Sequence, residues 1–388
     1  GYGGPAMPAS GPMKGSGLSH GMMGGQGGMG SMMPGMPATA GGAPGPNVLA
    51  RDLKRNRIVK EELDGMRSDL ESEEKSLEEA APDPATPGTE EYQAIIENPF
   101  VPVAQQPVST FSADVDTGSY ANVRRFLQQG QLPPPDAVRL EEMVNYFTYE
   151  YPKPTGGAPF SVNMETASCP WSEGHRLVRI GLKGREIDRE QRGPSNLVFL
   201  LDVSGSMSDE NKLPLVKRAM MMLASQLTED DRVAIVTYSN TAEVRLESTN
   251  GTRKEEICRL IETLQAGGST NGSAGIQLAY EQARKNFVKK GTNRVILVTD
   301  GDLNVGITRD EDLVKLIRGE RQSGVFLTVL GVGTGNLKDA KMEKLADHGN
   351  GKYAYLDGVK EAHKVLVEQM SGSLVTIAKD VKLQVEFG

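Results

Sequence analysis

The chain has 388 residues, of which 38 % are hydrophobic and 24 % are charged, so we expect a folded core in part of it. Its formal net charge of −8 argues against a nucleic-acid-binding role, because phosphate binding needs a concentrated basic surface. It contains no run of about 18 apolar residues, so we expect no transmembrane segment. The two cysteines, Cys169 and Cys258, are too few for a disulfide framework, and we expect two unpaired thiols.

The first 97 residues differ in composition from the rest. Residues 1–48 are mostly Gly, Met, Pro, Ser and Ala, which predicts a disordered tether. Residues 49–80 are rich in Glu, Lys, Arg, Asp and Leu, which predicts a charged helix, and residues 81–97 form a linker that opens with several prolines. Two interpretations of the helix stay open: a solvated helix, or a short coiled coil that allows self-association through residues 51–80. The apolar stripe behind the second interpretation is Val59, Leu63, Met66, Leu70 and Leu77.

Residues 98–190 carry mixed signals of helix and strand. Residues 109–116 alternate like a strand, Ser119 is predicted to be the N-cap of a helix that Gly130 closes, and a second helix follows Pro135. Two further strands are predicted at 160–167 and 176–182. At the other end of the chain, residues 374–388 contain a strictly alternating stretch, which predicts a half-buried strand. We expect it to return and pair with the 160–190 strands, and because the chain stops within it, we expect a truncated C-terminus.

Between these flanks, in residues 191–373, strands and helices alternate. Residues 197–201 and 294–298 are continuous apolar runs, as expected for strands that are buried on both faces. The fold class that this predicts is α/β, a doubly wound and mostly parallel sheet, flanked by a small β-structure built from the N- and C-terminal segments. In such sheets ligands bind at the carboxyl ends of the strands, near the point where the strand order reverses.

Short oxygen-bearing side chains gather at those strand ends. The first apolar strand continues into Asp202, Ser204 and Ser206, a Gly-rich loop carries Thr270, and the 294–298 strand continues into Asp300. This set supplies only hard oxygen ligands, which suit Mg²⁺, Mn²⁺ or Ca²⁺ rather than a His/Cys zinc site. The competing interpretation is that these residues are ordinary turn and cap residues with no metal.

With these loops in order, the sequence resembles the von Willebrand factor type A (Rossmann-like) fold with its metal-ion-dependent adhesion site. The resemblance implies that Ser204, Ser206 and, in the ligand-ready state, Thr270 touch the metal directly, while Asp202 and Asp300 act mostly through water and hydrogen bonds. A cation with largely neutral direct ligands stays electrophilic and can accept an Asp or Glu carboxylate from a protein partner.

More narrowly, residues 95–387 resemble the YfbK-like group of bacterial von Willebrand A proteins. The resemblance rests on the segments 111–125 (FSADVDTGSYANVRR) and 133–147 (PPPDAVRLEEMVNYF). It implies an extracytoplasmic, envelope-lipoprotein-like location, although this chain contains no lipobox cysteine.

Two other motifs are assigned ordinary structural roles. Residues 116–119 spell the aspartic-protease signature, but no second copy supplies the partner carboxylate, so capping is the better interpretation. Residues 331–335 (GVGTG) hint at a phosphate loop but have the wrong spacing, so we predict a turn that leaves the sheet. Asp302 and Asn304 flank the metal edge and are candidates for adjusting its charge or its choice of partner.

The leading functional hypothesis is a non-enzymatic, cation-dependent binding module. Two alternatives stay open: a metal-dependent hydrolase that uses the same edge, for which no general base is evident, and an assembly protein whose metal site is vestigial.

Overall fold

The computed structural model describes residues 90–112, 115–186, 193–270, 272–301, 310–369, 378 and 381–387. All of them belong to the second of the two units into which the chain divides, Ser72–Gly388. The predicted tether, the charged helix and most of the linker lie outside the described residues, as do Asp302 and Asn304.

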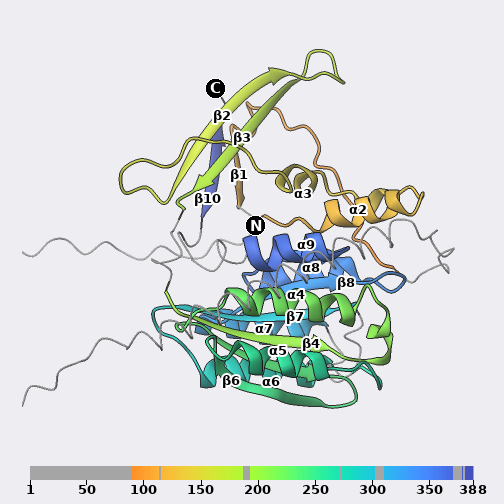
Figure 1. Cartoon of the computed structure of the whole chain (residues 1–388). Coiled ribbons are helices and arrows are strands. Elements are labelled where there is room, and N and C mark those ends of the chain that lie inside the picture. The colour runs from red at the N-terminus through yellow and green to blue at the C-terminus, as the bar shows by residue number, and fades with distance from the viewer. Residues whose placement is uncertain are drawn as a thin grey trace, which may run out of the picture. The chain divides into compact units, whose positions relative to one another are not determined.

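A six-stranded sheet forms the centre of the described unit (Figure 1). The strand order is β6-β5-β4-β7-β8-β9, and within it only the edge strand β6 runs antiparallel to its neighbour. The doubly wound, mostly parallel sheet predicted from the sequence is therefore confirmed. Its strands are β4 (Ser195–Asp202), β5 (Arg232–Tyr238), β6 (Ala242–Asn250), β7 (Thr292–Thr299), β8 (Phe326–Val332) and β9 (Tyr353–Leu356).

Helices cover both faces of this sheet and bury two separate apolar cores. Alternate residues of β4 point to opposite faces, so Phe199 joins one core and Leu200 joins the other, which explains why this strand is apolar throughout. The first core contains α4 (Leu213–Gln226), α5 (Lys254–Thr263) and α9 (Val359–His363), which continues into the π-helical turn η4 (Lys364–Gln369). The second contains α6 (Gly272–Lys285), α7 (Asp310–Ser323) and α8 (Asp339–His348).

The chain winds outward from β4 in both directions, since β5 lies on one side of it and β7 on the other. The strand order therefore reverses next to β4. The loops that follow β4 and β7 leave the sheet at this reversal, where ligands bind in open α/β sheets.

Two short antiparallel ribbons lie outside the central sheet. One pairs β1 (Val108–Ser112) with β10 (Lys382–Glu386), and the other pairs β2 (Phe160–Ser168) with β3 (Arg176–Gly184). The predicted return of the C-terminal strand to the N-terminal flank is confirmed, but the predicted pairing with residues 160–190 is wrong. Its alternation fixed which face is apolar, whereas the choice of neighbour depends on tertiary contacts that a single strand does not encode.

The N-terminal flank also contains the helices α2 (Gly118–Gln128) and α3 (Leu140–Asn145) and a short 3₁₀ turn, η1 (Pro135–Ala137). The predicted N-cap role of Ser119 is wrong, because α2 begins at Gly118 and Ser119 is fully buried inside it. Its hydroxyl donates to the carbonyl of Ala137 (2.7 Å), and its backbone N–H donates to Glu142 (2.8 Å). Asp116 of the same motif accepts the backbone N–H of Tyr353 in β9 (2.7 Å), so the motif ties the flank together and joins it to the sheet.

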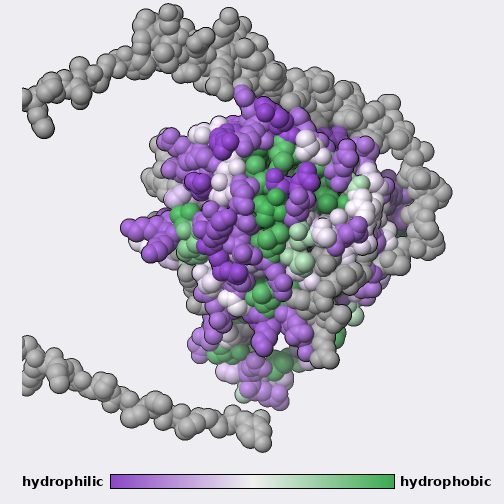
Figure 2. Space-filling view, turned by 90° about the horizontal axis from the view of Figure 1, so that it is seen from below, coloured by the Kyte–Doolittle hydropathy of each residue, from purple (hydrophilic) through white to green (hydrophobic). Residues whose placement is uncertain are grey.

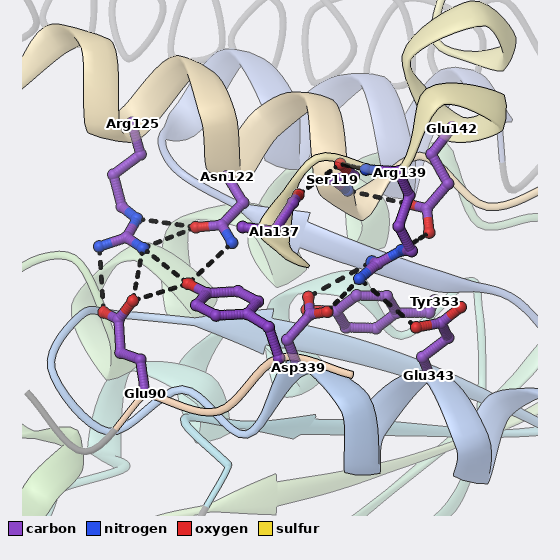
Figure 3. A network of polar contacts seen from close by, with 11 residues as sticks. Glu90, Ser119, Asn122, Arg125, Ala137, Arg139, Glu142, Asp339, Glu343 and Tyr353 are labelled. Carbon is purple, nitrogen blue, oxygen red and sulfur yellow. Dashed lines mark hydrogen bonds and ion pairs between the residues drawn. The ribbon is translucent and has the colours of Figure 1, made fainter. Parts of the chain in front are cut away.

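Ion pairs fasten the flank to the turn that follows β9 and to the helices α8 and α9. Arg124 binds Asp357 through two contacts of 2.6 Å and also binds Glu361 (2.9 Å). Arg139 contacts Asp339 and Glu343 of α8 as well as Glu142 of the flank (Figure 3). Each carboxylate that the central α/β unit contributes to these contacts has its cationic partner on the flank.

The free edge of the sheet at β6 is protected by charge. Glu243, Arg245 and Glu247 are exposed and alternate with partly or fully buried residues. Figure 2 views the molecule from the side that carries β6 and α6 in Figure 1, and polar residues surround the apolar ones there. Alternating charges of this kind discourage another strand from adding to an open edge.

Cys169 and Cys258 are both free thiols, as predicted. None of the described helices combines the length and apolarity that crossing a bilayer requires.

Candidate metal centre

Asp202 is the last residue of β4 and is fully buried at the carboxyl end of the sheet. One carboxylate oxygen, Oδ1, accepts the backbone N–H of Ser204 (2.9 Å). The other, Oδ2, accepts the hydroxyls of Tyr238 (3.1 Å) and Thr299 (3.0 Å), which stand at the ends of the two neighbouring strands. Both oxygens are therefore engaged by protein donors, which suits a positioning role better than direct coordination.

The two serines of the predicted site lie side by side in the turn after β4. Their hydroxyl oxygens are 3.1 Å apart; Ser204 is buried, whereas Ser206 is exposed at the start of a 3₁₀ turn, η3 (Gly205–Ser208). The backbone of this turn is held by the Ser204 N–H bond to Asp202. Two neutral oxygens are thus presented together, one of them facing solvent.

The Gly-rich loop that carries Thr270 lies against this turn. Gly267 N–H donates to the carbonyl of Val203 (2.8 Å), and Gly205 N–H donates to the carbonyl of Gly268 (2.9 Å). Asn240, in the turn between β5 and β6, accepts both the N–H and the hydroxyl of Ser269 at 2.7 Å. Thr270 follows at the end of this braced loop and is half-buried.

Asp300 follows β7 and is also fully buried. The ammonium of Lys212 lies 3.1 Å from its Oδ2 and 3.3 Å from the side-chain oxygen of Asn336. The next residue, Gly301, has φ +113°, and a Cβ there would overlap the backbone of residues 336–338. This close approach requires glycine, so the Asp300 turn and the 336–338 loop are packed directly on one another.

The two carboxylates differ in their protonation energetics. Burial raises the pKa of Asp202 to about 6, and the nearby negative charge of Asp300 adds to this, although hydrogen bonds from Ser204 and Thr299 oppose it. Burial also disfavours the charged form of Asp300, but hydrogen bonds from Asn336 and Ser206 and the charge of Lys212 outweigh it, so its pKa is lowered. The pair is a buried concentration of negative charge that one protein cation only partly offsets.

The donor set fits a hard divalent cation. It consists of hydroxyl and carboxylate oxygens, which are the ligands that such cations prefer. Among the described residues, no group of three or more His, Cys, Asp or Glu side chains is placed to hold a metal ion, so a cation at this site would depend on the hydroxyls as well as on the two carboxylates. Of the five predicted residues, the structure links Asp202, Ser204 and Ser206 by hydrogen bonds, joins Asp300 to Ser206, and brings the Thr270 loop against the serine turn.

The 331–335 segment forms the predicted turn out of β8. Gly333 and Gly335 have positive φ values of +74° and +90°. The backbone N–H of Gly335 donates to the carboxylate of Glu90 (2.8 Å), and the next residue, Glu91, donates its backbone N–H to the carbonyl of Leu337 (2.9 Å). The end of the linker, residues 90–91, therefore braces the same loop that carries Asn336 to Lys212.

Four residues around the site were not among those predicted from the sequence. Lys212 stands just before an apolar helix, and its position gives no sign that the side chain turns inward. Tyr238 completes a buried strand and therefore resembles a core residue. Thr299 ends β7 and Asn240 closely follows β5. The expectation that ligands bind at the carboxyl ends of the strands, which identified Asp202 and Asp300, could therefore have identified these two residues as well.

Family models match two segments of the chain. Residues 196–369 match the von Willebrand factor type A domain, and residues 86–179 match a family described as von Willebrand factor. The chain is 48 % identical over 313 residues to the uncharacterised protein YfbK of Escherichia coli K12, covering 78 % of this chain and 54 % of that protein. It is 31 % identical over 217 residues to the uncharacterised protein sll0103 of Synechocystis, covering 55 % of this chain and 50 % of that protein. The chain thus spans about half the length of these relatives.

Among solved structures, proximal thread matrix protein 1 from the mussel byssus is 22 % identical. The match covers 50 % of this chain and 48 % of that one, with a TM-score of 0.37, and that structure is described as having a zinc-occupied MIDAS motif. The fold, the domain match and the relationship to YfbK agree on one assignment: this chain is a von Willebrand factor type A domain protein that is similar to the bacterial YfbK-like group.

Proposed function

We propose that this protein is a divalent-cation-dependent binding module, whose metal-ion-dependent adhesion site accepts a carboxylate from a protein partner. Asp202, Ser204, Ser206, Thr270 and Asp300 would hold the cation, with Mg²⁺ favoured and Mn²⁺ or Ca²⁺ as alternatives. When bound, the cation would supply a Lewis-acidic position that attracts an Asp or Glu side chain.

The observation that supports this proposal most strongly is the difference in hydrogen bonding and exposure between the Asp202 carboxylate and the two serine hydroxyls. Both oxygens of Asp202 already accept hydrogen bonds from protein groups, whereas the hydroxyls of Ser204 and Ser206 are adjacent and one is exposed. Direct ligands would then be largely neutral, which leaves more positive charge on the cation for an incoming carboxylate.

We also propose that the role is non-enzymatic and that the protein acts in the cell envelope, by analogy with the YfbK-like group. Binding of a protein partner is the common use of the von Willebrand A fold. A hydrolase would need a general base beyond the ligand carboxylates, and the geometry of the described site suggests no candidate.

The test is calorimetric titration of Mg²⁺ and of Mn²⁺ into the full chain, the Asp202→Ala variant and an Asp230→Ala control. Asp230 is an exposed aspartate in the turn before β5, so it lies at the amino ends of the strands, opposite the candidate metal centre. We expect saturable binding in the wild type and the control and none in Asp202→Ala. Folded wild-type protein that binds neither metal at millimolar concentration would refute the proposal and favour the assembly-protein alternative.

If the metal binds, the carboxylate specificity can be tested directly. A peptide library in which one position is Glu is compared with the same library carrying Gln, in Mg²⁺ and in chelator. Retention that requires both Glu and Mg²⁺ supports the proposal, while retention of both libraries in chelator contradicts it.

A further inference from the structure

One charged residue at the candidate metal centre is not part of the family's ligand motif. Lys212, the residue before α4, is only 4 % exposed, and its ammonium reaches inward to Asp300 (3.1 Å) and Asn336 (3.3 Å). The methylene stem packs against Gly333, where any Cβ would overlap it. The lysine is therefore held in place along its length and is not a surface side chain that happens to fold inward.

A buried ammonium beside a buried carboxylate must be explained by charge, because burying either group alone is costly. Lys212 has a second carboxylate nearby, that of Asp209, whose Oδ2 lies 3.8 Å from the ammonium nitrogen. This carboxylate is largely exposed, so water already screens its charge. The carboxylate whose charge requires a counter-ion is that of Asp300, which is fully buried and close enough to Asp202 for the two negative charges to repel each other.

We propose that Lys212 is a fixed counter-charge that sets the net charge of the metal site. This inference rests on the proposed function. The two buried aspartates and Lys212 together carry a formal charge of −1, so a bound dication leaves the site at +1. Without the lysine, the same site would be neutral after metal binding and would attract a partner's carboxylate less strongly.

Two measurable consequences follow. The lysine repels a dication, so it weakens metal affinity while making the metal-loaded site more attractive to an anion. It also neutralises Asp300 in the absence of metal, so it stabilises the metal-free protein. Lys212 is thus a positioning and charge-setting residue rather than a ligand.

The first experiment compares the wild-type full chain with Lys212→Met, which keeps an unbranched apolar stem of similar length and removes the charge. Calorimetric titration with Mg²⁺ is expected to show tighter binding in Lys212→Met, by roughly tenfold or more for one unit charge near the site. Thermal melts in chelator are expected to show a lower Tm for Lys212→Met.

The matched control is Lys217→Met, within α4, the helix that Lys212 precedes. Its ammonium binds the backbone carbonyls of Glu262 and Leu264 and, within the part of the chain that the structure describes, no carboxylate. This variant is expected to leave Mg²⁺ affinity unchanged whatever it does to stability. Equal or weaker Mg²⁺ binding in Lys212→Met, with the control unchanged, would overturn the proposal.

A double-mutant cycle in chelator covers the case in which Lys212→Met folds poorly. If Lys212 acts through the charge of Asp300, the lysine substitution lowers Tm in the wild type but has little effect in an Asp300→Asn background. An equal loss in both backgrounds would overturn the proposal. A wild-type chain that binds no Mg²⁺ would instead refute the proposed function, and the cycle would still decide the role of Lys212.

Discussion

Replacing Arg139 with methionine should destabilise the protein strongly. Arg139 is 6 % exposed and is the cation shared by three carboxylates, Glu142 of the flank and Asp339 and Glu343 of α8 (Figure 3). Glu142 and Asp339 are themselves buried, so the substitution leaves two buried carboxylates without their counter-ion.

The expected size follows from this geometry. Removing one partner of a buried ion pair costs about 3–5 kcal/mol of unfolding free energy, because the remaining charge stays desolvated. For a unit of this size, that loss lowers Tm by roughly 5–10 °C. The Arg139→Met variant should also recover part of the lost stability at low pH, where protonation of the carboxylates removes their uncompensated charge.

The assay is thermal unfolding followed by circular dichroism at pH 5 and pH 8, with Arg179→Met as the control. Arg179 pairs with Glu165 on the β2–β3 ribbon, where both side chains are more than half exposed, so its loss should cost at most about 1 kcal/mol. A Tm loss in Arg139→Met no larger than in Arg179→Met would show that the buried network does not hold the flank to the domain.

Three further outcomes can be checked in the same way. Glu343→Gln should raise Tm at pH 8 and have no effect at pH 4. Burial lifts the pKa of Glu343 to about 7, against about 4.5 in the unfolded chain, so ionisation of this residue destabilises the folded state at pH 8, while at pH 4 it is protonated in both states. Equal effects at both pH values would contradict this. Gly333→Ala should cost more stability than Gly335→Ala, because both have positive φ but only at Gly333 would the new methyl overlap another side chain, that of Lys212; equal losses in urea melts would show that crowding is irrelevant. Tyr238→Phe should cost about 1 kcal/mol and weaken Mg²⁺ binding, since its hydroxyl is a donor to Asp202; an unchanged titration would mean that this bond does not position the carboxylate.

The central sheet was predictable because its strands are buried on both faces. Continuous apolar runs such as 197–201 are typical of strands in a sheet that helices cover on both sides, and the position of Asp202 and Asp300 directly after such runs located the candidate site. The metal itself stays a prediction, as does the role of each of the five residues.

What the sequence did not predict depends on contacts between distant segments. The alternation of β10 identified an apolar face but not β1 as its neighbour, and the preference of serine for helix starts suggested a cap where Ser119 instead holds the carbonyl of Ala137. The inward turn of Lys212 depends on a buried carboxylate 88 positions further along the chain. Such pairings become visible only when the fold brings their members together.

The ion pairs between the flank and the domain have an evolutionary consequence. Glu361 and Asp339 are buried acids of the von Willebrand A domain, and the arginines that balance them, Arg124 and Arg139, belong to the flank that precedes it. A domain copied into another gene without that flank would inherit the acids without their counter-ions. The two segments are therefore expected to be inherited as one module, and a lineage that loses either arginine should replace its acidic partner as well.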